Sequence, residues 1–295
     1  MRYKNIVALI LVLFSLFAII GLVSAAPLTP SDDVKKAIKE APSGAVIELD
    51  PTKGDFKINS IGMDVTLNCI TIKSSKTNKN AVIDLGGKFG FIGDKLTFIN
   101  ITMKNGKQNG ATGTAISAKD LTLIGCTFMK NTATGYSAGG AISSEVTLTA
   151  TKCIFKDNTA ASGGAIVASG KSKVTNCIFT NNKAPSASEG GIGGAIIGNG
   201  ALDVTKCTFT KNIAYLNGGA IVVASGKATI TNSKFTQNAA THSAGGQGGG
   251  GAVSNFGKTT IKSCTFTKNT GKQGTQKGTL YSGYGKITTS KCTFK

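Results

Sequence analysis

The feature that most constrains this chain is an internal repeat made of two alternating signatures. The first signature, Cys-x-Phe-x-x-Asn, begins at Cys126, Cys153, Cys177, Cys207 and Cys264, at Ser233 with Ser in the Cys slot, and at Cys292 as a partial copy. The second, Gly-Gly-Ala-Ile, lies between copies of the first and begins at Gly139, Gly163, Gly193 and Gly218. The phenylalanines of successive copies are 24 to 31 residues apart. A period of this length predicts a stack of similar structural units.

Each repeat contains three short segments that are typical of β-strands. One surrounds the Phe, one is Gly-Gly-Ala-Ile, and one precedes the Cys slot, as in Leu121-Thr122-Leu123. Apolar residues at alternate positions indicate a strand with one buried side. Strands this short bury enough apolar surface only when equivalent strands of successive repeats pair side by side, about 4.8 Å apart. We therefore predict an all-β fold, a right-handed parallel β-helix like the solenoid of pectate lyases, with three strands per coil.

Glycine and asparagine mark the corners of the predicted coil. The Gly-Gly pairs provide backbone freedom without side-chain bulk. An Asn follows each repeat Phe by three positions, and we expect it to adopt left-handed backbone and to bond to the Asn of the neighbouring coil. Residues 186–190 and 242–249 are additions to the repeat, which predicts loops of different length at one corner. The Phe, Ile and Cys positions then form inward-facing columns.

Six of the seven cysteines occupy or lead the same repeat slot. Because one residue separates this Cys from the repeat Phe, both side chains point to the same side of the strand. We predict a buried column of free thiols that act as small apolar side chains. Disulfides, which are common in exported chains, would need side chains that converge, whereas stacked ones are parallel. A metal is not predicted, because ligands in a ladder are not tetrahedrally arranged.

The first 26 residues are typical of a signal peptide. Arg2 and Lys4 precede a nearly unbroken apolar run over residues 6–23, and Ser24-Ala25-Ala26 supplies the small residues of a cleavage site. The run is also long enough to remain as a membrane anchor, which is the alternative interpretation. In both cases the rest of the chain is exported, and we expect no membrane insertion after cleavage.

Residues 27–54 differ from the repeats and are expected to cap the first coil. Ser31-Asp32-Asp33 is a helix start, because its acidic side chains suit the positive end of a helix. Val34, Ala37 and Ile38 fall on one face of this short helix, and residues 45–49 are expected to form a first strand. Residues 55–295 carry the predicted β-helix. The sequence predicts no equivalent cap at Lys295, where a further copy or a partner is expected to cover the coil.

The chain is strongly basic, with a formal net charge of +19 at pH 7, and almost all of its positive charge is lysine. Arg2 lies in the predicted signal peptide, so the remainder lacks the bidentate guanidinium groups that recognise phosphate. Few aromatic residues accompany the lysines, which argues against nucleic acid as a partner. Two interpretations stay open: scattered lysines keep a repetitive β surface soluble, or they bind an acidic polymer or anionic cell surface.

The acidic residues do not form a predicted active site. Those of the main repeats occupy different slots: Asp120, Glu145, Asp157, Glu189 and Asp203. Asp64, Asp84 and Asp94 are the best remaining candidates, and Asp84 is expected to shape a turn. His242 is the single His and lies in a Gly-rich loop. We therefore predict no catalytic, cofactor-binding or metal-binding residue, and no cofactor.

The alternation of Phe-x-x-Asn with Gly-Gly-Ala-Ile resembles the repeat of chlamydial polymorphic membrane proteins. The Cys-x-Phe copies and the helix-plus-strand start also resemble adhesin-like proteins of methanogenic archaea. The resemblance is strong over residues 113–294 and loose over 31–112, and it implies a right-handed β-helix at the cell surface that is used in adhesion.

Our leading hypothesis is a secreted or cell-surface adhesin-like protein that attaches, without catalysis, to cells or polysaccharide. Its expected partner is a glycan or protein ligand outside the cell. The β-helix is also the fold of pectate lyases and polygalacturonases, so a polysaccharide-degrading enzyme is the second hypothesis. A passive structural unit of the cell envelope is the third.

Overall fold

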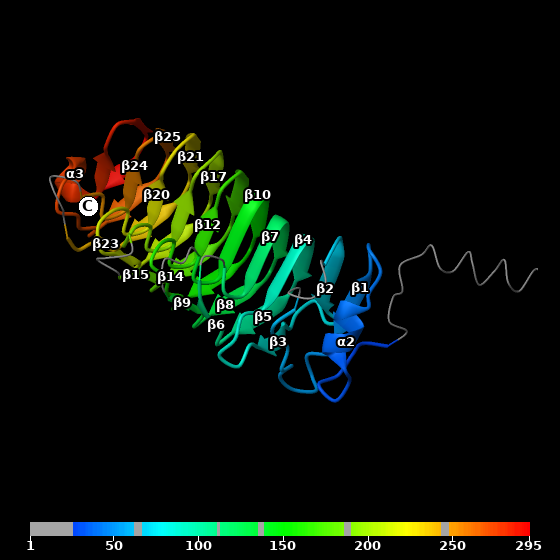
Figure 1. The fold of residues 1–295 in the computed structure, drawn as a ribbon. Helices are drawn as coiled ribbons and strands as arrows, with labels where there is room; N and C mark the ends of the chain where they lie inside the picture. Colours follow the sequence, from blue (N-terminus) through cyan, green and yellow to red (C-terminus); the bar gives the residue numbers. More distant parts are fainter. Residues whose placement is uncertain (1–25, 62–66, 111–112, 135–138, 186–189, 243–247) are drawn as a thin grey trace, which may run out of the picture.

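The structure is a computed structural model that describes residues 26–61, 67–110, 113–134, 139–185, 190–242 and 248–295. The predicted signal peptide lies outside these residues except for Ala26. The described chain is an elongated stack of coils, with a short helix near residue 35 at one end and the C-terminus at the other (Figure 1). This is the parallel β-helix that the repeats predict.

Two long parallel sheets run along the stack. The 15-stranded sheet, here sheet A, consists of β1 (Val46–Leu49), β2 (Ile70–Ser74), β4 (Phe91–Ile99), β7 (Ile116–Ile124), β10 (Ile142–Thr151), β12 (Ile166–Ala168), β13 (Lys171–Thr175), β16 (Ile196–Gly198), β17 (Leu202–Thr205), β20 (Ile221–Val223), β21 (Lys227–Thr231), β24 (Val253–Asn255), β25 (Lys258–Lys262), β27 (Leu280–Ser282) and β28 (Lys286–Ser290). The nine-stranded sheet, here sheet B, consists of β3 (Ala81–Asp84), β5 (Ile101–Lys104), β8 (Thr127–Met129), β11 (Ile154–Lys156), β14 (Ile178–Thr180), β18 (Thr208–Thr210), β22 (Lys234–Thr236), β26 (Thr265–Thr267) and β29 (Thr293–Phe294).

The predicted coil of three strand segments is confirmed, with one local difference. In β4, β7 and β10 the segment at the Gly-Gly-Ala-Ile position continues into the segment before the Cys slot as one long strand, whereas from β12 onward the two are separate strands. We attribute the difference to glycine at the corner between the two segments. Gly170, which follows β12, has no room for a side chain, because a Cβ there would lie 2.0 Å from the carbonyl oxygen of Val146. β10 has Glu145 and Val146 at this corner and continues through it with a local irregularity.

Short ladders that the sequence did not predict follow the Asn corner in several coils. They are β6 (Lys107–Asn109) with β9 (Thr132–Thr134), and β15 (Lys183–Ala184) with β19 (Ile213–Ala214) and β23 (Ala239–Ala240). Two or three residues give too little alternation to be recognised as strands. The predicted insertions at 186–190 and 242–249 follow β15 and β23 in the sequence, and residues 186–189 and 243–247 are outside the described residues.

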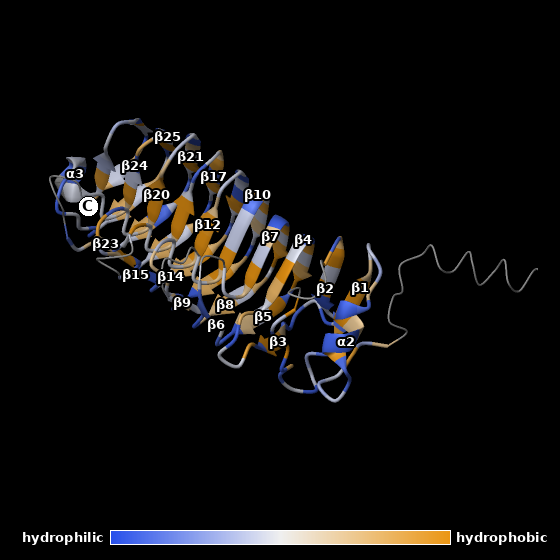
Figure 2. Ribbon diagram, viewed as in Figure 1, coloured by the Kyte–Doolittle hydropathy of each residue, from blue (hydrophilic) through white to orange (hydrophobic). Residues whose placement is uncertain are grey.

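The interior consists of columns of identical side chains. The rings of Phe155, Phe179, Phe209, Phe235 and Phe266 are buried and stack with centroids 4.8 Å apart and nearly parallel planes. Isoleucines at the Gly-Gly-Ala-Ile position pair in the same way, as in Ile166 with Ile196. Figure 2 shows this alternation as hydrophobic residues recurring in the strands of successive coils. Because each residue packs on its own equivalent, the repeat itself specifies the core.

The asparagine corner confirms one part of the prediction and corrects another. Asn131, Asn158, Asn182, Asn212, Asn238 and Asn269 are buried and hydrogen-bond along the ladder, as predicted. The left-handed residue, however, is the one before each Asn, as at Lys130 and Lys211, with φ of 56° and 55°. The Asn side chain must face inward to reach the next coil. The left-handed conformation that the turn requires is therefore adopted by the residue before it.

The predicted Gly-Gly corners are confirmed, with a different reason for each glycine. The first adopts left-handed backbone, as Gly193 does with φ of 65°. The second, such as Gly194, leaves no room for a side chain, because a Cβ would lie 2.1 Å from the carbonyl oxygen of Gly219 in the next coil.

The cysteine column is buried from Cys126 to Cys264, Cys292 at its end is half-buried, and its thiols are free, as predicted. The Sγ of Cys177 accepts a hydrogen bond from the backbone N–H of Cys153, and the Sγ of Cys207 accepts one from Cys177, both at 3.4 Å. Ser233 fills the slot in the next coil, where its hydroxyl accepts the N–H of Cys207 at 3.1 Å. Burial raises the pKa of Cys264 to about 11, so this thiol stays protonated at neutral pH.

The N-terminal segment forms the predicted helix and strand. Helix α2 (Val34–Lys39) begins after Asp33, whose side chain accepts the backbone N–H of Lys36 at 3.0 Å. Val34 and Ile38 are buried in the same core cluster as the coils. At the other end of the stack lies α3 (Thr275–Gly278), one turn long. No helix in the described ranges is long and apolar enough to cross a membrane.

Candidate binding surface

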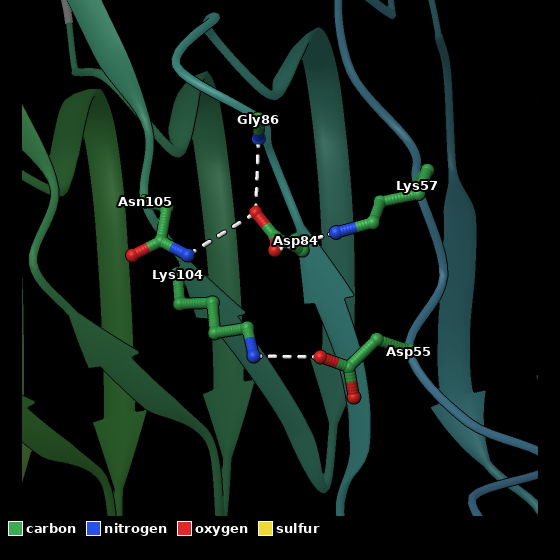
Figure 3. Close-up of polar contacts among 6 residues, drawn as sticks. All are labelled: Asp55, Lys57, Asp84, Gly86, Lys104 and Asn105. Atoms are coloured by element: carbon green, nitrogen blue, oxygen red, sulfur yellow. Dashed lines mark hydrogen bonds and ion pairs between the residues drawn. The ribbon is translucent and has the colours of Figure 1, made fainter.

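The candidate Asp84 lies in a network of charged side chains on the first coils of sheet B. Its carboxylate accepts hydrogen bonds from Lys57 Nζ at 2.7 Å, from the backbone N–H of Gly86 at 3.0 Å and from Asn105 Nδ2 at 3.3 Å (Figure 3). Beside it, Lys104 Nζ lies 2.6 Å from a carboxylate oxygen of Asp55. The bond from Gly86, which has left-handed backbone, confirms that Asp84 shapes a turn.

The electrostatics of this network favour fixed charges over proton transfer. Partial burial opposes ionisation of Asp84, but the hydrogen bonds from Lys57, Gly86 and Asn105 outweigh it and hold the pKa of this carboxyl below its usual value. The hydrogen bond to Asp55 raises the pKa of Lys104. A general acid or base works best with a pKa near the operating pH, and both shifts lead away from it. The network therefore suits a structural role that joins coils distant in sequence.

The candidate Asp94 lies on sheet A, apart from Asp84. Its carboxylate is 2.8 Å from Lys119 Nζ, and the hydrogen bond between them raises the pKa of Lys119. Asp94, Lys119 and Glu145 line a shallow hollow where β4, β7 and β10 bend. The structure thus separates Asp84 from Asp94, and Asp64 is outside the described residues.

The remaining candidates are also dispersed. Asp120 accepts a hydrogen bond from Thr147, Asp157 accepts one from Asn181, and Asp203 is exposed on β17. Glu189 is outside the described residues. The ring of His242 stacks on Tyr215 with centroids 3.9 Å apart. Within the described ranges no three His, Cys, Asp or Glu residues gather in a group that could hold a metal ion.

The outer side of sheet B carries a regular array of threonines that the sequence analysis did not single out. We call it the threonine face and define it by the outward residues of β14, β18, β22 and β26: Ile178, Thr180, Thr208, Thr210, Lys234, Thr236, Thr265 and Thr267. Its six threonines are half-buried, and none of their hydroxyls has a hydrogen-bond partner among the described residues. The face therefore presents unused donors and acceptors at the spacing of the coils.

Three exposed lysines lie in the corners beside the threonine face. Lys206 precedes the Cys slot of β18, and Lys211 and Lys268 precede the Asn that follows β18 and β26. All three have left-handed backbone, and the other corners of the face carry Asn, Ser or Gln. A sequence signal for this surface exists in Thr208-Phe209-Thr210 and Thr265-Phe266-Thr267, where Thr lies on both sides of the inward Phe.

The comparisons with known protein families agree with this architecture. The family model of the right-handed β-helix region matches residues 54–209, which is more than half of the chain. The chain belongs to the right-handed β-helix family. The model of the Chlamydia polymorphic membrane protein repeat matches residues 206–224, which contain one copy each of Cys-x-Phe-x-x-Asn and Gly-Gly-Ala-Ile. The fold class and the resemblance to the chlamydial polymorphic membrane protein repeat are thereby confirmed.

Among solved structures, this β-helix is similar to an alginate lyase from Paenibacillus sp. str. FPU-7. The two share 19% identity with a TM-score of 0.36, over 87% of this chain and 97% of the lyase chain. A likeness of this degree carries no information about activity. No curated protein matches the sequence.

Proposed function

We propose that this β-helix is an exported, surface-associated, adhesin-like protein that attaches to cells or polysaccharide without chemical conversion of its ligand. The observation that carries the proposal is the threonine face, a straight array of hydroxyl groups without partners, flanked by exposed lysines. Ordered hydroxyl and ammonium groups on a rigid sheet suit the binding of an extended polar chain, because they lose little freedom on binding. The polymorphic membrane protein repeat and the predicted signal peptide support a location outside the cell.

The placement of the acidic side chains supports binding over catalysis. Asp84 and Asp94 are each held by a lysine, they lie on different sheets, and the remaining carboxylates are dispersed among coils. Hydrolysis or elimination of a polysaccharide needs an acid and a base that converge on one bond. The ion-paired network around Asp84 keeps its charges fixed instead.

A combined binding and cleavage assay tests this function. Purified protein is incubated with acidic and neutral polysaccharides, with and without calcium, and then with whole cells. We expect co-sedimentation with at least one polymer or cell type and no new reducing ends or unsaturated products. Cleavage of any polymer would refute the proposal in favour of a lyase or hydrolase, and failure to bind every polymer and cell would refute it in favour of a structural unit.

A further inference from the structure

The cysteine column places the thiols of successive coils directly over one another. The backbone N–H that follows each Cys of the column donates to the carbonyl oxygen of the Cys in the preceding coil, as Ile178 does to Cys153 at 2.9 Å. The column consists of an uninterrupted run of four, then Ser233 in the same slot, and then a pair. The run is Cys126, Cys153, Cys177 and Cys207, and the pair is Cys264 and Cys292.

The spacing of the coils sets the spacing of these sulfurs. The stacked rings of Phe179 and Phe209 give a rise of 4.8 Å per coil between equivalent groups. The thiols share this register, and the thiol of Cys153 interacts directly with those of Cys126 and Cys177 on either side. Two metal–sulfur bonds in line, each as long as a zinc–thiolate bond of about 2.3 Å, span about 4.6 Å. The gap between two stacked sulfurs therefore matches a metal ion that both sulfurs hold in a straight line.

This geometry selects among metals. Each gap supplies two sulfur ligands on opposite sides, in keeping with the finding that no three His, Cys, Asp or Glu residues of the described ranges surround one point suited to a metal ion. Structural zinc needs four ligands in a tetrahedron, which a ladder does not offer. Cu(I) prefers soft thiolate ligands and forms stable linear complexes with two of them. The column therefore suits Cu(I) and excludes zinc.

We propose that the cysteine column is a binding site for Cu(I), with one ion in each gap between neighbouring sulfurs. The run from Cys126 to Cys207 has three such gaps, and the pair of Cys264 and Cys292 has one. Each ion forms two copper–sulfur bonds and displaces one thiol proton to solvent, without a change in the oxidation state of copper or sulfur. Three of the four thiols in the run and one of the two in the pair lose their protons, so the column stays electrically neutral and avoids the cost of a charge in an apolar interior. This site is independent of ligand binding at the threonine face.

The backbone around the column favours sulfur bound to a metal. The N–H of Cys153 donates to the Sγ of Cys177, and the N–H of Cys177 donates to the Sγ of Cys207, both at 3.4 Å. Such donors stabilise the negative charge of a metal-bound thiolate. The proton that copper displaces makes only a weak bond, since the thiol of Cys177 donates to the carbonyl oxygen of Ala150 at 3.5 Å. Binding thus gains two copper–sulfur bonds per ion and loses little hydrogen bonding.

Ser233 separates the run from the pair. Its hydroxyl oxygen is a harder ligand than a thiolate, so Cu(I) does not bridge from Cys207 to Cys264 through it. Access also differs between the two parts. Cys292 is half-buried, whereas the run is fully buried and is reached through local opening of the coils. We therefore expect the pair to take up copper before the run does.

The test compares variants that shorten or lengthen the column with one outside it. Cys177→Ser divides the run and should lower the copper content from about four to about two ions per chain, whereas Ser233→Cys makes the column continuous and should raise it to about six. Cys69→Ser is the matched control, because Cys69 is half-buried, lies outside the column and hydrogen-bonds to Asn68. Circular dichroism melting verifies that each variant is folded.

Cu(I) is supplied without oxygen, both to the folded protein and during refolding, and a copper chelator then removes loosely held ions. Mass spectrometry counts the copper, and X-ray absorption gives its ligands. We expect retained copper with two sulfur ligands, a higher melting temperature, no retention of Zn(II) and an unchanged copper content in Cys69→Ser. No retained copper by either route, copper with three or more ligands, or a content that Cys177→Ser leaves unchanged would overturn the proposal. If Cys177→Ser does not fold, Ser233→Cys decides, and a content that does not rise overturns it. Each of these failures leaves the proposed attachment function intact, because that function rests on the threonine face.

Discussion

The asparagine ladder makes the most specific prediction about stability. Asn182 Nδ2 donates to the carbonyl oxygen of Phe155 at 3.0 Å and to Asn212 Oδ1 at 2.9 Å. Its Oδ1 accepts from the backbone N–H and the Nδ2 of Asn158, at 3.1 and 3.0 Å. All four hydrogen bonds are buried. Asn182→Leu keeps a side chain of similar size and removes every one of them.

The cost follows from the groups that are left without partners. Two donors of Asn158 lose their acceptor, and each buried polar group left unpaired costs about 1–3 kcal/mol. We therefore expect Asn182→Leu to lower the free energy of unfolding by about 2–6 kcal/mol, counting those two donors. The loss is local, because a solenoid coil contacts only its neighbours.

Urea unfolding followed by circular dichroism measures this change. Asn199→Leu is the matched control, since Asn199 is exposed in the next coil and its side chain has no hydrogen-bond partner among the described residues. The control is expected within about 0.5 kcal/mol of wild type. If the midpoint of Asn182→Leu moved no further than that of the control, the ladder would contribute nothing beyond its backbone bonds, and the reasoning would be wrong.

Four further changes probe other parts of the coil. Phe179→Asp, which buries an unpaired charge in the ring stack, should lower the unfolding free energy by more than about 4 kcal/mol, and unchanged thermal melting would refute the inward Phe column. Gly194→Ala should destabilise the protein strongly in a urea titration, and more than Gly198→Ala, because its Cβ would meet a backbone oxygen at 2.1 Å whereas that of Gly198 meets side-chain carbon at 3.0 Å. The Cys264 thiol, with its pKa raised to about 11, should resist iodoacetamide at pH 8 in the folded protein and react after denaturation, as read by mass spectrometry. The folded-state pKa of Asp84 lies below its unfolded value of about 3.9, so its stabilisation is complete above that pH and disappears as the pH falls through the folded pKa; Asp84→Asn should flatten this acid-side loss in unfolding experiments.

Only part of the candidate surface could be predicted from the sequence. The Thr-Phe-Thr segments are visible in the sequence, and the strand period places both threonines outward. That their hydroxyls have no partners depends on what surrounds them, and this requires the packed coils. The same is true of the charges, because sequence alone does not distinguish the paired Lys104 from the unpaired Lys211.

The repeat by itself determined the fold and most of the core. In a stack of similar coils the partner of each side chain is its own equivalent one repeat away, so Phe179 meets Phe209 without any knowledge of distant structure. The alternation of inward and outward side chains along each strand also identifies the inward residues, which is why the Phe and Cys columns were predicted correctly.

The tertiary structure decided the backbone conformation of the corners and the register between coils of unequal length. The left-handed residue precedes Asn rather than being Asn, because the ladder bond requires the Asn side chain to point inward. Two predicted strands merge in β10 because its corner lacks the glycine that other coils place there. Asp55 and Lys104 are 49 residues apart and meet only because the stack brings their coils together. Local periodicity carries no information about such contacts, because the coils differ in length and the loops determine which residues of neighbouring coils lie side by side.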